Sequence, residues 1–307
     1  MEIFLQQLVN GIVLGSIYAL VALGYTLVYG ILGLINFAHG DIVMIGAMVT
    51  LAVVHFLSGT GLPGPALVGT GVLVAAIVCM ALGYLVERIA YRPLRDAPRL
   101  APLITAIGVS ILLQNAAMMI WGREYLSFPP LFQSGSFTFS GVSISPIQIL
   151  ILCASAAMMG ALSWMVKRTR LGNAMRATAQ HPEVATLLGV DSNLIISITF
   201  IIGSALAAVA GTMVGAYYGI AHYDMGFMLG LKAFTAAVLG GIGNIEGAML
   251  GGILLGVIES MGAGYLGSLT DGVFGSNYQD VFAFFVLILV LVFRPSGLLG
   301  EQVGDRP

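Results

Sequence analysis

Charge is what this chain has least of. Among its 307 residues only 8% are Asp, Glu, Lys or Arg, whereas 58% are hydrophobic. A soluble domain typically carries about 25% charged residues, because water must solvate its surface. Because 8% charged residues cannot cover the surface of a globule of this size, the outer surface of the protein must face lipid. This composition excludes a soluble enzyme, a disordered regulator and a nucleic-acid-binding protein with a basic face.

Cysteine and lysine are also scarce, with two residues of each. Cys79 and Cys153 lie in apolar runs and are predicted to be small hydrophobic residues rather than a disulfide. Neither lysine follows the glycine spacing of a P-loop, and no H-E-x-x-H or G-x-S-x-G motif is present. The run from Gly241 to Glu246 lacks the last glycine of G-x-G-x-x-G and lies between apolar segments. We therefore expect no catalysis, cofactor or metal ion, and the net charge of −2 indicates no nucleic-acid partner.

Long apolar runs, in contrast, are abundant, and a membrane span needs about 20 apolar residues. By that measure we predict eight spans: Leu5–Tyr29, Asp41–Leu57, Ala66–Val86, Leu103–Trp121, Pro146–Val166, Ile195–Tyr218, Ala248–Leu266 and Val281–Phe293. Two further apolar pieces, Gly30–Gly40 and Phe227–Ile242, are short, and Lys232 interrupts the second, which could cross or turn back. The predicted fold is a single all-α integral membrane domain, residues 1–307, with about eight transmembrane helices and broken or re-entrant segments. The N-terminus lacks a basic n-region, so we expect no cleavable signal peptide.

Basic residues cluster in two loops, which indicates the orientation. One loop contains Arg88, Arg92, Arg95 and Arg99, and the other contains Lys167, Arg168, Arg170 and Arg176. Two predicted spans separate these loops, so the positive-inside rule places both in the cytoplasm. The 123–145 loop and the N-terminus are then outside, and Trp121 and Trp164 fall at the membrane interface. If Phe227–Ile242 crosses, Arg294 lies inside as well, which the same rule favours.

Glycine is frequent, with 41 residues, and several glycines stand four apart on one helix face. The pairs are Gly11 and Gly15, Gly211 and Gly215, Gly247 and Gly251, and Gly252 and Gly256. This spacing lets a neighbouring helix backbone approach closely in a membrane. We therefore predict that these glycines serve helix packing.

Two glycine-rich breaks in the chain resemble each other. Gly33–Asp41 and Gly240–Glu246 each contain an Asn, then an acidic residue, and are followed by a Gly-Ala pair in an apolar run. Short apolar segments interrupted by glycine at corresponding places in two halves are typical of transporters with inverted repeats. This predicts an inverted internal repeat whose broken helices meet at a pathway. The alternative is that the two loops are unrelated.

Ionisable residues at membrane depth are costly there and are often functional. The candidates are His39, Asp41, Lys232, Glu246 and Glu259. Asp41 and Glu246 each precede a helical run, so stabilisation by the helix dipole is as good an explanation as a pathway role. Glu259 lies deep in its span and should have a hydrogen-bond partner, whereas Lys232 could snorkel outward. We expect Glu87 to be an interfacial charge.

One long polar segment, residues 167–193, is patterned for two short helices. Residues 171–180 are good helix formers. The sequence His181–Glu183 then breaks the helix and starts another, with proline at the first position and an acid at the positive end. Gly189 would end this second helix, and Asp191 or Ser192 would cap the next span.

The second of these helices carries an apolar stripe, formed by Val184, Leu187 and Leu188. The stripe needs a partner, which could be the lipid surface or a groove in a cytoplasmic protein. Because the basic residues stop at Arg176, the helix is a poor anchor for anionic lipid. We therefore favour docking to a protein.

Six segments of the sequence carry a family likeness: Asn10–Leu20, Gly24–Gly30, Ile35–Gly40, Glu87–Pro93, Lys232–Gly243 and Arg294–Gly297. Together they resemble the LivH-type permease of branched-chain amino acid ABC importers. The likeness extends from near the N-terminus to about Leu299. It is weakest in the 123–145 and 267–278 loops.

The resemblance implies a permease in the bacterial inner membrane that pairs with a second, related membrane subunit. It further implies two cytoplasmic ATPases as partners and a periplasmic binding protein that delivers substrate and largely sets selectivity. The segment that contacts an ATPase would contain Arg176, His181, Pro182, Glu183, Leu187 and Leu188. The pathway candidates are Asn36, His39 and Asn244, which match motif positions, together with Asp41 and Glu246. Closure of the ATPases would move the coupling segment and give alternating access.

Other functions stay open at this point. Permeases for urea or short amides share much of this motif set, so an amide could replace leucine, isoleucine or valine as substrate. An ion-coupled transporter that needs no ATPase would require carboxylates in the membrane, for which Asp41, Glu246 and Glu259 could serve. A purely structural scaffold would not explain the polar breaks.

Overall fold

The computed structural model describes residues 2–95, 97–98, 100–129, 135, 137–139, 141–270 and 278–300. Its α-helices are α1 (Glu2–Leu32), α2 (His39–Leu57), α3 (Gly64–Leu85), α4 (Leu100–Trp121), α5 (Pro146–Arg168), α6 (Arg170–Gln180), α7 (Pro182–Leu187), α8 (Ser192–Tyr218), α9 (Met225–Gly240), α10 (Ile245–Leu269) and α11 (Gln279–Phe293). Three short turns of other helix types are η1 (Ser58–Thr60), the π-helix η2 (Val86–Tyr91) and η3 (Arg92–Leu94). Four short strands are β1 (Leu126–Ser127), β2 (Phe137–Phe139), β3 (Val142–Ile144) and β4 (Ile220–Ala221). The strands pair antiparallel as β1 with β4 and β2 with β3.

The helices agree with the predicted membrane fold. Within the described residues, seven helices are long and apolar enough to cross a membrane, and α9 and α11 are shorter apolar helices. Each of the eight predicted spans coincides with one helix, the last with α11. The all-α membrane fold is therefore confirmed.

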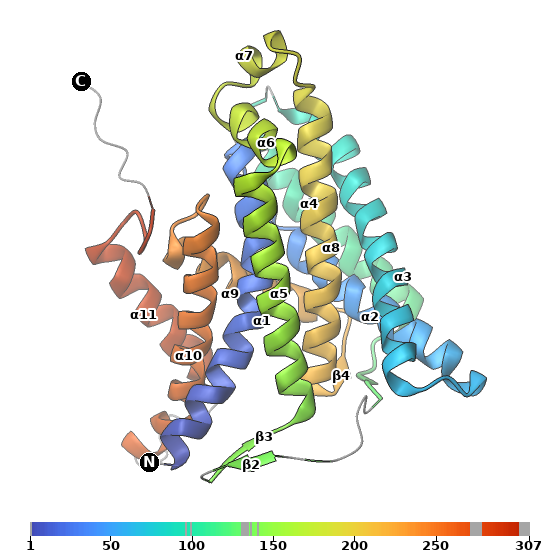
Figure 1. The fold of residues 1–307 in the computed structure, drawn as a ribbon, viewed down its shortest axis with the longest axis vertical. Coiled ribbons are helices and arrows are strands. Elements are labelled where there is room, and N and C mark those ends of the chain that lie inside the picture. The colour runs from blue at the N-terminus through green and yellow to red at the C-terminus, as the bar shows by residue number, and fades with distance from the viewer. Residues whose placement is uncertain are drawn as a thin grey trace.

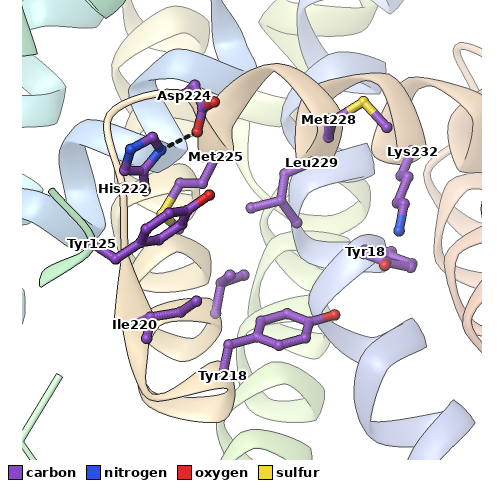
Figure 2. A pocket seen from close by; sticks show the side chains of 11 residues that line it. Tyr18, Tyr125, Tyr218, Ile220, His222, Asp224, Met225, Met228, Leu229 and Lys232 are labelled. Atoms are coloured by element: carbon purple, nitrogen blue, oxygen red, sulfur yellow. Dashed lines mark hydrogen bonds and ion pairs between the residues drawn. The ribbon is translucent and has the colours of Figure 1, made fainter. Parts of the chain in front are cut away.

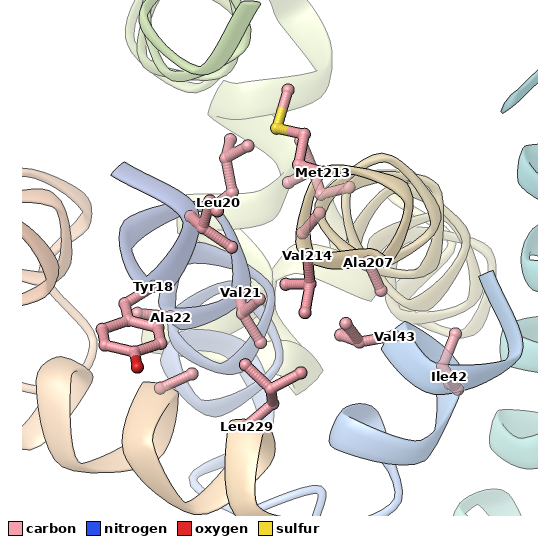
Figure 3. Close-up of a cluster of buried hydrophobic side chains, with 14 of the residues drawn as sticks. Tyr18, Leu20, Val21, Ala22, Ile42, Val43, Ala207, Met213, Val214 and Leu229 are labelled. Carbon is pink, nitrogen blue, oxygen red and sulfur yellow. The ribbon is translucent and has the colours of Figure 1, made fainter. Parts of the chain in front are cut away.

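The bundle is layered around α1 (Figure 1). The most apolar stretch of α1 is 94% buried, against 22% in each of α3, α4 and α5. Figure 3 shows part of the interior, where Val21 of α1 meets side chains of α2, α8 and α9. On the outer helices, large apolar side chains such as Ile77, Leu112 and Phe293 point outward. Apolar side chains on the outside of the bundle are expected where the surroundings are lipid.

The glycine pairs pack helices as predicted. A Cβ at Gly11 would lie 2.6 Å from the Cα of Val257, and one at Gly15 would lie 2.6 Å from the Cα of Ile253. Gly251 of α10 is equally close to the backbone of α9, since a Cβ there would overlap the carbonyl oxygen of Ala236. Close approach of this kind leaves no room for a side chain and gives α1 and α10 a long shared interface.

The two ends of the bundle differ, as Figure 1 shows. We call one of them the inner end; it carries α6, α7 and the start of α8. Arg95 lies at this end too, because it donates a hydrogen bond to Asn193 at the start of α8. The outer end carries the four strands. Arg99, the remaining arginine of the first predicted basic loop, lies outside the described residues.

The short apolar segment Phe227–Ile242 crosses. It follows β4 near the outer end, and it is followed by Glu246, which pairs with Lys167 at the inner end. After α11 the chain returns to this end, where the Leu298 amide donates to the carbonyl of Leu239 at 2.9 Å. Arg294 therefore lies on the inner side, as the positive-inside rule favours.

An inverted repeat is present, but its halves differ from the predicted ones. Helices α1 and α8 run in opposite directions (Figure 1), and each is followed by a break and a second helix, α2 or α9. In this repeat α1, α2 and α3 correspond to α8, α9 and α10. The helix contacts agree with this correspondence: α1 packs on α10, its counterpart α8 packs on α3, and α2 packs on α9. The counterpart of Gly33 is thus Gly219, and pairing Gly33–Asp41 with Gly240–Glu246 was wrong.

Candidate functional site

Two broken helices meet inside the bundle. Gly33 after α1 and Gly219 after α8 have φ angles of +62° and +71°, the left-handed region that glycine adopts without strain. Each turns the chain back into the protein before α2 or α9 begins. The first turns of these helices cross so closely that a Cβ at Gly40 would lie 2.7 Å from the Cα of Gly230. Backbone breaks at such places are tolerated only where protein or a water-filled cavity surrounds them.

Three predicted pathway residues lie at the first of these breaks, and all are buried. His39 packs against Gly24 and lies edge-on to the ring of Tyr25, with 4.9 Å between ring centroids. Asp41 accepts a hydrogen bond from Gln114 Nε2 at 3.0 Å. Asn36 accepts one from the Tyr91 hydroxyl at 3.1 Å. These contacts fix the start of α2, and a role in translocation stays a prediction.

Asn244 and Glu246 lie elsewhere, in the turn between α9 and α10 at the inner end. Asn244 Oδ1 accepts from the Gly247 amide at 3.0 Å and so caps α10, while its Nδ2 donates to the Leu299 carbonyl at 2.9 Å. Glu246 is exposed and pairs with Lys167. Since the repeat relates Gly33 to Gly219, these two residues do not join His39 and Asp41 in one site. A part in translocation stays a prediction for both.

A second polar cluster joins four helices, α1, α9, α10 and α11. Lys232 Nζ donates to Glu259 Oε1 at 2.8 Å and lies 2.7 Å from Asp280 Oδ1. Glu259 also accepts from the Tyr18 hydroxyl at 3.0 Å. The predicted partner of Glu259 is therefore confirmed, whereas outward snorkelling of Lys232 was wrong, because its side chain is only 11% exposed. Burial of these charges is tolerated because Lys232 forms an ion pair with each acid and Glu259 accepts two hydrogen bonds.

Two members of this cluster, Lys232 and Tyr18, line one end of a cavity of about 220 Å³ (Figure 2), while Glu259 and Asp280 pair with Lys232 from outside its lining. Lys232, Tyr18 and Tyr218 line that end, and Tyr18 lies half-way along α1. Apolar side chains of α8 and α9, including Val214 and Leu229, line the middle. The cavity thus combines an apolar middle with a few polar groups at its two ends, the usual make-up of a small-molecule site.

The outer end of the cavity is covered by the β1–β4 pair. Tyr125, just before β1, stacks on His222, just after β4, with 4.2 Å between ring centroids. His222 Nε2 donates to the Arg123 carbonyl at 3.0 Å, and its other ring nitrogen pairs with Asp224. The external loop and the second break are therefore held together over the cavity.

The sequence did not group the residues of this cavity. Tyr18, Tyr218 and His222 come from distant parts of the chain and share no motif. Asp280 has the sequence position of an ordinary acidic residue in the first turn of a helix. The available signal was Lys232, a cation inside an apolar segment, which should have been expected to have an acidic partner.

Glu87, which the sequence predicts to be an interfacial charge, is fully buried in the protein, and its depth in the membrane stays a prediction. It lies in the π-helix η2, where Arg92 Nε is 3.3 Å from its Oε1 and Arg95 pairs with it as well. The Ser197 hydroxyl donates to Glu87 Oε2 at 2.7 Å. This network ties the end of α3 to the first turns of α8. π-Helical turns of this kind are frequent at functional sites.

The predicted pair of short helices in segment 167–193 is confirmed as α6 and α7. Thr169 caps α6, Pro182 begins α7, and Gly189 follows α7 with a φ of +87°. Asp191 is the residue that caps α8, through the amides of Asn193 and Leu194. Local sequence therefore determines this part of the fold.

The two helices present different surfaces. Arg176 of α6 is tied to the protein, because it bonds to Asn173 at 2.6 Å and to the carbonyl of Val166 at the end of α5. In contrast, Leu187 and Leu188 are 86% and 78% exposed at the tip of α7. His181, Pro182 and Glu183 are exposed beside them. The apolar stripe projects beyond the bundle (Figure 1) and has no partner within the described residues.

Comparison with known proteins gives a consistent result. A family model described as branched-chain amino acid transport system, permease component, matches residues 7–291. The high-affinity branched-chain amino acid transport system permease protein BraD of Pseudomonas aeruginosa is 51% identical over 99% of this chain and 98% of its own length. The protein LivH of Escherichia coli, with the same description, is 45% identical over 99% and 97%. The autoinducer 2 import system permease protein LsrC of Photorhabdus laumondii is 27% identical over 64% of the chain.

Proposed function

Because the chain belongs to the permease family of branched-chain amino acid transport systems, we propose that it is the membrane subunit through which an importer moves leucine, isoleucine and valine. The substrate is taken from the names of relatives that match almost the whole chain at 45–51% identity. The importer is ATP-driven and lies in the bacterial inner membrane. This chain pairs there with a second permease subunit, receives substrate from a periplasmic binding protein, and leaves hydrolysis to two cytoplasmic ATPases.

The observation that carries the proposal is the bare tip of α7. An exposed Leu187 and Leu188 on a cytoplasmic helix are costly in water and suit a hydrophobic groove in a partner. α7 is joined directly to α6 and α8, and Arg176 holds α6 against the end of α5. A push on α7 is therefore transmitted to helices that reach the centre of the bundle. This is the arrangement that coupling to an ATPase requires.

Self-sufficient ion-coupled transport is less well supported. Of the three carboxylates it would use, Glu246 is exposed at the inner end, and Glu259 is neutralised by Lys232. Asp41 is buried among the contacts that hold α2. No two of them share a site.

The double variant Glu183→Ala with Leu188→Ala tests the docking role. Loss of the exposed contacts should weaken copurification of the ATPases and lower ATP-dependent leucine uptake by about tenfold or more, since a few anchors dominate an interface. The control is Ile107→Ala with Leu112→Ala, which removes exposed apolar side chains of α4 on the lipid-facing surface. Unchanged copurification and uptake in the α7 variant would refute docking, and uptake of urea in place of leucine would refute the substrate.

A further inference from the structure

We propose that the cavity between α1, α8 and α9 is an occupied station on the substrate's route, and that it binds a zwitterionic amino acid with a branched aliphatic side chain. The carboxylate of the amino acid would bind to Lys232 and the side chain would bind against α8 and α9. This inference rests on the proposed function, but it assigns a binding site to the permease itself and not to the external binding protein.

The charges at the Lys232 end of the cavity favour a ligand with both signs. Lys232 has three N–H donors. One is donated to Glu259, and Asp280 lies within ion-pair distance of the ammonium, so at least one N–H is left for a further acceptor. The two carboxylates outweigh the one ammonium, so the cluster has a formal charge of −1. This excess negative charge would repel a simple anion. A zwitterion avoids this problem, because its ammonium group is attracted by the negative charge while its carboxylate binds the lysine.

The remaining walls favour an aliphatic body. Met225 and Leu229 line the cavity between Lys232 and His222 (Figure 2), and Val214 of α8 lines it as well. Tyr218 presents its hydroxyl at the same end as Lys232, so this end offers a hydroxyl group beside the ammonium group. Urea or a short amide would leave the apolar wall without a partner, whereas a branched side chain would bury surface against it.

Photo-leucine, a leucine analogue with a diazirine in its side chain, tests this assignment on the full-length chain in lipid nanodiscs. Labelling should saturate and should map by mass spectrometry to the α8 and α9 peptides that contain Val214, Met225 and Leu229. An excess of leucine should compete, whereas leucinamide, which lacks the carboxylate, should compete about tenfold less well because it loses a charge-assisted hydrogen bond. Unsaturable labelling, or labelling mapped outside the cavity, would overturn the proposal.

Variants separate binding from folding. Leu229→Trp fills the cavity while it leaves Lys232 and its two acidic partners in the sequence, and it should reduce labelling about tenfold, whereas Leu289→Trp, on the outward face of α11, should not. Lys232→Gln should also lose labelling, with Lys167→Gln, the chain's other lysine, as its control. Because Lys232→Gln leaves two acids unpaired and could fail to fold, the tryptophan pair decides. Equal labelling of Leu229→Trp and Leu289→Trp, in a protein that imports leucine normally, would refute the cavity site while leaving the proposed function intact.

Discussion

Glycine is the residue on which helix packing in this chain depends most directly. At Gly15 and Gly256 the backbones of α1 and α10 touch, because neither helix carries a side chain at the crossing. In lipid the hydrophobic effect does not hold helices together, so close van der Waals contact of this kind supplies much of the attraction. Other glycines, such as Gly160 in α5, have no neighbour within 4 Å where a Cβ would be placed.

The contrast between these two kinds of glycine gives a first prediction. Gly15→Ala should lower the free energy of unfolding by about 2 kcal/mol, because the new Cβ meets the Ile253 backbone and separates the helices. Gly160→Ala should raise it by up to about 1 kcal/mol, because only the helix propensity changes. Unfolding of both variants by denaturant in detergent would measure the difference. Equal effects of the same sign would contradict the packing role of Gly15.

At the scale of elements, the broken helices and the strands between them shape the outer cavity. The break before α9 contains β4, which pairs with β1 of the external loop and holds Tyr125 over the cavity mouth. This pair has only two residues in each strand, so few hydrogen bonds resist its opening. We therefore expect this pair to be able to open.

A disulfide across this pair should block transport. Ser127 and Ile220 are register partners, so Ser127→Cys with Ile220→Cys can be crosslinked by an oxidant in a Cys153→Ala background, since Cys79 is buried. We expect leucine uptake to fall close to background on oxidation and to recover with dithiothreitol, because substrate cannot pass the closed strands.

The hairpin β2–β3 provides the matched control for this experiment. Thr138→Cys with Ser143→Cys crosslinks register partners in the same external loop. This crosslink does not involve the cavity, so uptake should persist under oxidation. Equal inhibition by both crosslinks, or by neither, would show that opening of β1–β4 is not required.

At the scale of the whole molecule, the chain begins at the outer end of the bundle and its last described residues lie at the inner end (Figure 1). This arrangement follows because α9 crosses and does not turn back. Both basic loops and Arg294 then lie on one side, in agreement with the positive-inside rule.

Reporter fusions test this orientation. Green fluorescent protein fused to the C-terminus should fluoresce, because the positive-inside rule predicts that the inner end faces the cytoplasm. Alkaline phosphatase needs the oxidising periplasm for its disulfides, so it should be active when fused after Gly122 and inactive when fused after Gly189. Phosphatase activity at a C-terminal fusion would mean that the inner and outer ends are assigned incorrectly.

The sequence alone determined the positions of the helices and the pair α6 and α7, and it predicts the orientation. These features depend on local properties of the chain: the length of an apolar run, the placement of arginines, and capping residues such as Thr169 and Asp191. The glycine pairs were likewise visible, since residues four apart share a face wherever the helix packs.

Only the tertiary structure decided which charges meet and where a cavity forms. Lys232, Glu259, Asp280 and Tyr18 come from four helices, and Tyr18 and Glu259 are 241 residues apart in the chain. Glu87 is buried because α8 packs over η2, which no nearby residue indicates. The true repeat was equally hidden, because it relates helix directions and packing instead of residue identities. Long-range packing of this kind leaves no periodic signal in the sequence, so the residues it assembles could not be grouped until the helices were in place.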